Sequence, residues 1–213
     1  MSSGEADGGG TRVFAPPMPH VTTETAIGPL FRRKYDTLAI TGVPGTGKTT
    51  LATALSEQLG WPVLSTGNVA RVTDPGGLAS GDMAEESDFA LAFARHYQRM
   101  LNLSPTPIIL DGIPRTVGQL GYLQPDTTRV LLLTARRDVA VDRLRRRGRE
   151  DDTPELIEKR IRQQGALLQI DDPDGWAFQI AGFHTSVSTT YKTSGMVAEG
   201  VIQYLLGNRT EAF

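Results

Sequence analysis

The sequence has 213 residues, with 39% hydrophobic and 22% charged residues, a formal net charge of −2 and no cysteine. This composition is ordinary for a globular domain. It excludes disulfide bonds and thiolate metal sites, and the near-neutral charge gives no general attraction for nucleic acid or acidic membranes. The longest apolar run, VLLLTA at 130–135, is too short to cross a bilayer, and the N-terminus lacks the apolar core of a signal peptide. We therefore expect a cytoplasmic protein without nucleic-acid or membrane partners, and we take a monomer as the starting expectation.

Regular patterning begins near Tyr35. Residues 1–34 are rich in Gly, Pro, Ser and Thr and predict a flexible extension, so we expect a single domain over 35–213. TLAIT at 37–41 predicts a short buried strand. TTLATALSEQLG at 49–60 then predicts a helix, because its leucines recur every four residues and a glycine ends it.

Strand and helix patterns alternate through the rest of the domain. Further strands are predicted in 61–65, 106–112 and 129–135, and helices in 89–101, 116–123, 138–147 and 154–168, with a fifth strand within 175–188 and a closing helix over 195–206. This alternation favours an α/β fold with a parallel sheet flanked by helices on both faces.

The loop between the first strand and the first helix carries a phosphate-binding motif. In AITGVPGTGKTTLA, residues 39–52, the spacing G-x-x-x-x-G-K-[ST] is complete. Its glycines allow backbone amides to point inward at phosphates, and the helix N-terminus adds the positive end of its dipole. We predict that the loop binds ATP through Gly42, Pro44, Gly45, Thr46, Gly47, Lys48 and Thr49.

Asp111 ends a predicted buried strand. Ligands bind at the carboxyl edge of an open parallel sheet, and a carboxylate there is placed to hold Mg²⁺ beside the Thr49 hydroxyl. The alternative is an aspartate that caps the next turn; the phosphate-binding loop favours the magnesium role.

Six arginines fall in segments expected at the same sheet edge: Arg71, Arg115, Arg143, Arg147, Arg149 and Arg160. Guanidinium groups suit the neutralisation of ATP and a second phosphorylated substrate. A solvated helix end or a nucleic-acid patch would also explain RLRRRGR, but interleaved aromatic residues are absent. No general base stands out, and a phosphate acceptor needs none because its attacking oxygen is already ionised. The pattern therefore favours transfer between phosphates.

Five ordered segments carry a family resemblance. GVPGTGK, STGNVAR, DGIPRTVGQ, RLRRRGREDD and EKRI occur in this order between about residues 36 and 165. Together they resemble the nucleoside monophosphate kinases, most closely the adenylate kinases. The resemblance implies a P-loop kinase fold with a small acceptor-binding insert at 67–104 and a short lid at 145–155.

The resemblance also implies roles for single residues. Lys48 and the loop amides would hold the ATP phosphates, Thr50 matches the usual threonine of the loop, and Arg143 would pack on the ATP base. Arg71 and Arg115 would clamp the monophosphate, while Thr66 and Gln119 are similar to the pair that reads an adenine acceptor. The family's catalytic residues are matched by Lys48, Arg115, Arg147, Arg149 and Arg160.

The sequence departs from the family pattern at several points. Asn68 replaces the usual aspartate, the span from Arg71 to Asp111 is shorter than typical, and only Gly148 separates Arg147 from Arg149. We predict Mg²⁺-dependent phosphoryl transfer from ATP to a nucleoside monophosphate, with AMP as the first candidate. A kinase for CMP, dCMP or a specialised monophosphate is one alternative. A nucleotide-binding regulator without turnover is the other.

Overall fold

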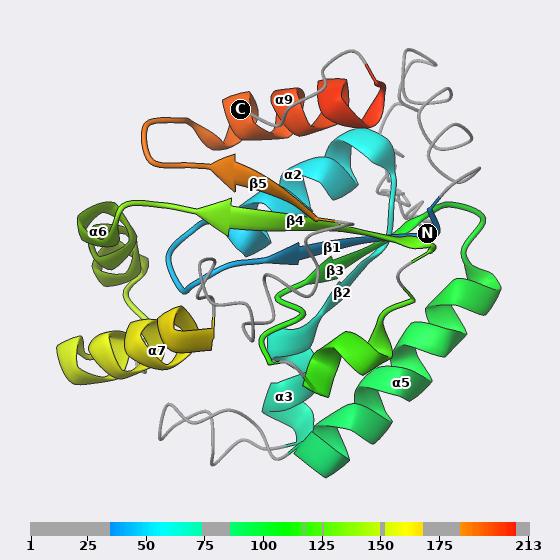
Figure 1. The fold of residues 1–213 in the computed structure, drawn as a ribbon, viewed down its shortest axis with the longest axis horizontal. Coiled ribbons are helices and arrows are strands. Elements are labelled where there is room, and N and C mark those ends of the chain that lie inside the picture. The colour runs from blue at the N-terminus through cyan, green and yellow to red at the C-terminus, as the bar shows by residue number, and fades with distance from the viewer. Residues whose placement is uncertain are drawn as a thin grey trace, which may run out of the picture.

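Five parallel strands form a sheet in the order β2-β3-β1-β4-β5 (Figure 1). The computed structural model describes residues 35–73, 86–116, 118–124, 126–149, 152–167 and 184–207, and the predicted extension over 1–34 lies outside them. The strands are β1 (Thr37–Thr41), β2 (Val63–Ser65), β3 (Ile108–Asp111), β4 (Thr128–Thr134) and β5 (His184–Ser188). The predicted parallel α/β architecture is confirmed.

The central strand β1 explains how the sheet is covered on both faces. All five of its residues are buried, and successive side chains point to opposite faces. Leu38 and Ile40 pack in one apolar cluster with Leu55, whereas Ala39 packs in a second cluster with Phe93. The continuous apolar run of this strand is what two covered faces require.

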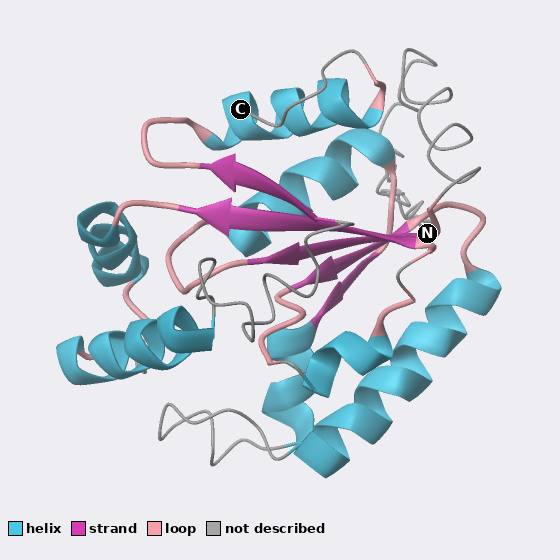
Figure 2. Cartoon of the chain, viewed as in Figure 1, coloured by secondary structure: helices cyan, strands magenta, loops and turns pink. Residues whose placement is uncertain are grey.

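Two helical layers supply those covers (Figures 1 and 2). Helices α2 (Lys48–Leu59) and α9 (Ser194–Leu205) pack against each other and provide the first cluster. The opposite face is covered by α3 (Thr66–Thr73), α5 (Glu86–Leu103) and the 3₁₀ helix η1 (Gly118–Tyr122). The sheet is therefore sandwiched, and its carboxyl edge is the place left for a ligand.

Two further helices lie on the side toward which the arrowheads of β4 and β5 point (Figure 1). These are α6 (Arg137–Arg147) and α7 (Pro154–Leu167), which contact each other. They bring arginine-rich segments to the carboxyl edge of the sheet.

The predicted helices are confirmed, with two differences. The helix expected over 116–123 is instead the short η1, whose glycines at 118 and 121 weaken a longer helix. Helix α3 was not predicted, because its eight residues are too few to display a helical period. Within the described residues, none of the helices combines the length and apolar character needed to cross a membrane.

Candidate active site

The loop between β1 and α2 is compact because backbone segments pass close to its glycines. Gly42 has φ +141° and Gly45 has φ +83°, conformations that disfavour side chains. A Cβ on Gly42 would lie 2.3 Å from the carbonyl oxygen of Leu133, and one on Gly45 would lie 2.3 Å from that of Ala140. The Thr46 hydroxyl closes the loop by donating to the Val43 carbonyl at 2.9 Å. The loop is thus held against β4 and α6 before any ligand binds.

Lys48, the first residue of α2, folds back over this loop. Its Nζ donates to the carbonyl oxygens of Gly42 at 2.7 Å and Val43 at 2.9 Å. Loss of water around the ammonium, together with the nearby charges of Arg115 and Arg147, lowers its pKa to about 7 against the opposing effect of Asp111. A bound polyphosphate would restore the charged form of this lysine.

Asp111 lies where three strands meet. In the register of the sheet it pairs with Ile40 of β1 and Ser65 of β2. Its side chain accepts hydrogen bonds from the Thr49 hydroxyl at 2.8 Å and the Ser65 hydroxyl at 3.4 Å. The sequence pattern predicted that Thr49 and Asp111 lie together, and the structure brings them together.

This oxygen pair fits the predicted Mg²⁺. Mg²⁺ takes oxygen ligands, keeps several waters, and commonly uses one or two carboxylates together with substrate phosphates. Among the described residues there is no group of three or more His, Cys, Asp and Glu side chains that could form an all-protein cage. A hydroxyl and a single carboxylate beside the P-loop therefore match an ion that arrives with ATP, and its binding stays a prediction.

Arg115 is held from three directions. Its Nε donates to the Gly112 carbonyl at 2.7 Å, its Nη2 to the Thr66 hydroxyl at 3.2 Å, and its backbone N–H to Gln119 Oε1 at 2.7 Å. Thr66 is 3% exposed, and its hydroxyl also donates to the Asp111 carbonyl at 2.9 Å. Thr66 and Gln119 thus contact Arg115, and neither lines the cleft described below. Their reading of an acceptor base stays a prediction.

Arg71 is more open to solvent. It lies in the last turn of α3, and its Nη1 donates to Asn68 Oδ1 at 2.9 Å one turn earlier. Both residues line the cleft. Because asparagine is neutral, this contact leaves the positive charge of Arg71 uncompensated by its partner.

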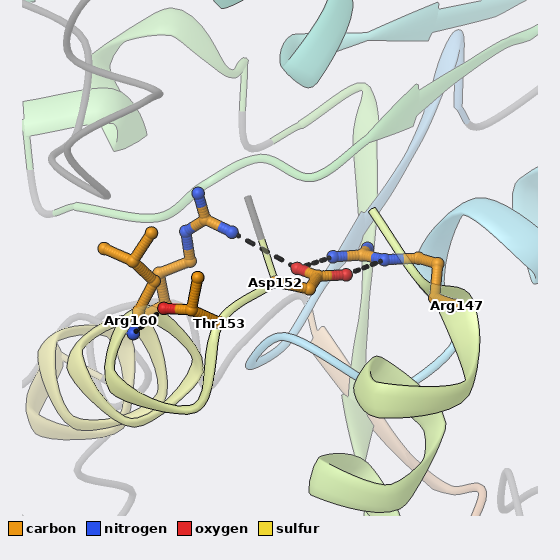
Figure 3. A network of polar contacts seen from close by, with 5 residues as sticks. Arg147, Asp152, Thr153 and Arg160 are labelled. Carbon is orange, nitrogen blue, oxygen red and sulfur yellow. Dashed lines mark hydrogen bonds and ion pairs between the residues drawn. The ribbon is translucent and has the colours of Figure 1, made fainter. Parts of the chain in front are cut away.

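Arg147 and Arg160 are joined by one carboxylate (Figure 3). Arg147 Nε and Nη2 donate to the two oxygens of Asp152 at 2.8 and 2.7 Å, and Arg160 Nη1 lies 3.4 Å from the same side chain. The Asp152 side chain is 2% exposed, compared with 37% for Arg147. Asp152 therefore links the end of α6 to α7. Residues 150 and 151 of the predicted lid lie outside the described residues.

The phosphate-binding loop, Asp111 and the arginines face a single cleft of about 880 Å³. Its lining includes Pro44, Thr50 and the loop between them, and it contains all six of the predicted arginines. Eight cations line it, with Asp111 as the one acid among the described lining residues: Lys48, Arg71, Arg115, Arg143, Arg147, Arg149, Arg160 and Lys192. In a chain of net charge −2, this concentration makes the cleft an anion site.

Some lining residues were not predicted. Thr189 and Lys192 follow β5, and Ser65 ends β2. No motif marks the region after β5, whereas the position of Ser65 at a strand end was a usable signal.

Comparison with known proteins agrees with this geometry. Residues 41–158 match a family model described as an AAA domain. An adenylate kinase from Synechococcus sp. (strain WH7803) is 37% identical over 150 residues, which cover 62% of this chain and 81% of the relative. One from Nocardia farcinica (strain IFM 10152) is 33% identical over 162 residues, covering 68% and 90%. The chain belongs to the adenylate kinase family of P-loop kinases.

Solved structures extend the likeness at the level of the fold. A gluconokinase from Sinorhizobium meliloti 1021 superposes with a TM-score of 0.59 at 16% identity, covering 83% of this chain and 95% of that one. A sugar kinase from Janibacter sp. HTCC2649 gives 0.60 at 15% identity, covering 80% and 94%. This member of the adenylate kinase family thus shares its P-loop kinase fold with kinases named for other acceptors.

Proposed function

We propose that this P-loop kinase transfers the γ-phosphoryl group of ATP to a nucleoside monophosphate, with AMP as the preferred acceptor. One observation carries the proposal: a single cleft joins the phosphate-binding loop to two groups of arginines, one from α3 and the segment after β3, and the other from α6, the turn after it and α7. That spread of charge suits two phosphorylated substrates that meet end to end.

The chemistry of the lining favours a phosphate acceptor over a hydroxyl acceptor. A hydroxyl must lose a proton during transfer, which calls for a positioned base. Asp111 is the one acid among the described residues of the cleft lining, and it accepts hydrogen bonds from Thr49 and Ser65. A phosphate oxygen is already ionised near neutral pH, so positioning and charge neutralisation suffice.

On the donor side, Lys48 and the loop amides would bind the ATP phosphates. Thr49 and Asp111 would hold Mg²⁺, which when bound neutralises phosphate charge and polarises the transferring group. Arg147, Arg149 and Arg160 would neutralise charge on the phosphoryl group in transfer. The bidentate contact with Asp152 keeps Arg147 in place without filling the cleft.

On the acceptor side, Arg71 and Arg115 would bind the monophosphate. Arg115 lies in the segment after β3. Its charge helps to lower the pKa of Lys48, and the charge of Asp111 raises the pKa of Arg115, so the three groups are close together. AMP is favoured over other monophosphates because relatives at 33–37% identity are adenylate kinases and because Thr66 and Gln119 resemble, in sequence, the adenine-accepting pair.

A panel of acceptors tests this function. ADP release would be followed with ATP, Mg²⁺ and each of AMP, CMP, dCMP, GMP, UMP and gluconate, with a Lys48→Met variant as the background control. We expect AMP-dependent turnover far above the rate without acceptor. Preference for gluconate would contradict the phosphate-acceptor argument, and preference for CMP or dCMP would contradict the AMP assignment. ATP binding without turnover on any acceptor would support a regulator.

A further inference from the structure

The segment that follows β5 contacts α6 and the residue before it. Three consecutive residues make the contacts. Thr189 accepts hydrogen bonds from the Arg143 side chain, the Thr190 hydroxyl accepts the Arg136 backbone N–H at 3.0 Å, and the Tyr191 hydroxyl accepts Arg136 Nη1 at 2.6 Å. None of the sequence motifs includes this segment, although part of it lines the cleft.

Thr189 is the buried member of this trio, with 5% of its surface exposed. Its hydroxyl and its carbonyl accept from the two terminal nitrogens of Arg143, Nη1 at 3.0 Å and Nη2 at 2.6 Å. The hydroxyl lies 3.0 Å from the Thr46 carbonyl in the phosphate-binding loop and 3.2 Å from the Thr134 carbonyl at the end of β4. One threonine therefore links β5, the P-loop and an arginine of α6.

The contact also fixes the orientation of the guanidinium. Its hydrogen-bond donors lie in the plane of the group, and Thr189 engages both terminal nitrogens along one edge. In-plane hydrogen bonds do not use the flat faces, which are the surfaces by which arginine stacks on aromatic rings. Arg143 lines the same cleft as the P-loop, so a nucleotide whose phosphates occupy that loop would bring its base into the cleft that Arg143 lines.

We propose that Thr189 is a positioning residue for the donor nucleotide: it holds the Arg143 guanidinium edge-on so that its face stacks on the base of ATP. The inference rests on the proposed function only in taking a nucleoside triphosphate as the donor. It requires no particular acceptor. Thr46 keeps its own hydrogen bonds to Val43 within the loop, so loss of the Thr189 hydroxyl should spare phosphate binding.

The test compares a ligand with a base and a ligand without one. Binding of ATP and of inorganic tripolyphosphate would be measured by calorimetry with Mg²⁺ for the full chain and for Thr189→Val and Thr189→Ser. We expect Thr189→Val to weaken ATP binding about tenfold, the effect of losing one hydrogen bond to a charged group. Tripolyphosphate binding should change by less than about twofold. Thr189→Ser, which keeps the hydroxyl, should bind both ligands like the natural chain.

Two further variants separate positioning from folding. Thr185→Val removes a hydroxyl on the preceding strand β5 that accepts from Arg129 Nη2 at 2.7 Å and lies outside the cleft lining, and it should leave both affinities unchanged. In an Arg143→Ala background, Thr189→Val should have no additional effect on ATP binding. Should Thr189→Val fail to fold, Thr189→Ala takes its place in every comparison.

Three results would overturn the proposal. If Thr189→Val weakens ATP and tripolyphosphate binding equally, Thr189 supports the phosphate-binding loop. If its effect on ATP affinity adds to that of Arg143→Ala, Thr189 acts independently of Arg143. If ATP affinity is unchanged, Thr189 has no role in donor binding. Turnover is not needed for any of these measurements. ATP binding that responds as expected in a chain that phosphorylates no monophosphate would refute the proposed function and leave this inference standing.

Discussion

Replacing Arg115 with methionine should abolish most acceptor turnover without weakening the fold. The guanidinium has five N–H donors, and its described side-chain contacts use Nε on Gly112 and Nη2 on Thr66. The remainder of the fork can bind an anion in the cleft. Methionine keeps the apolar stem and removes only the charged, hydrogen-bonding end.

The size of the expected effect follows from that geometry. Two hydrogen bonds to an ionised acceptor phosphate are worth about 3–6 kcal/mol together, which corresponds to a loss of roughly 10²- to 10⁴-fold in kcat/KM for the acceptor. The fold should not suffer, because partial burial already lowers the pKa of Arg115 and the charges of Arg160 and Arg71 lower it further, against the opposing effect of Asp111. Removing the cation relieves that repulsion.

Steady-state kinetics with varied acceptor, ATP affinity and a thermal melt would be measured together for Arg115→Met. The matched control is Arg146→Met on the exposed face of α6, where the side chain is 79% exposed and pairs with Asp142. The control should match the natural chain in all three measurements. Acceptor kcat/KM within a few-fold of the natural chain in Arg115→Met would refute the assignment, and a melting temperature that falls in parallel with activity would refute the separation of function from stability.

Three other predictions follow from contacts in the same cleft. Asp111→Asn should weaken Mg²⁺ affinity of the ATP-bound protein about 10- to 100-fold, measured by Mg²⁺ titration of turnover; an unchanged Mg²⁺ dependence would remove Asp111 from the metal site. The pKa of Lys48 in the folded protein, about 7, lies below its ordinary value of 10.5. Burial of the charged ammonium therefore lowers the free energy of unfolding fully below pH 7, and this destabilisation is lost as pH rises to 10.5. ATP binding should therefore take up protons between pH 7 and 9, seen by calorimetry in buffers of different ionisation enthalpy, and Lys48→Met should abolish this uptake. Gly112→Ala should lower the free energy of unfolding by about 1–3 kcal/mol, because Gly112 has φ +91° and a Cβ would lie 2.7 Å from Arg115 Nη2; denaturant unfolding at the natural value would contradict this.

Local patterns were enough to predict most of the fold. The P-loop and the strand before it combine a short-range motif with a continuous apolar run, and both signals arise within a few residues of chain. The arginines of the cleft were predictable for a related reason: each lies in a segment that follows the carboxyl end of a strand, after β2, β3 or β4. All six line the cleft.

Contacts between distant segments could not be predicted where no motif marks the partners. Thr189 and Arg143 are 46 positions apart and join only because β5 pairs with β4 in the sheet. Thr66 and Gln119 are predicted to read an acceptor base, and no pattern indicated that both also contact Arg115. The type of a residue shows which groups its side chain can bind, but which residue it contacts depends on how distant segments pack in the folded protein.

Transfer of label from [γ-³²P]ATP tests the central claim most directly. The full chain would be incubated with Mg²⁺ and AMP, with Lys48→Met in parallel, and the products separated by chromatography. The cleft predicts label in ADP formed from AMP, little in inorganic phosphate, and neither product with Lys48→Met. Label found only in inorganic phosphate, or only in a phosphorylated sugar acid when gluconate is also supplied, would contradict phosphoryl transfer to a nucleoside monophosphate.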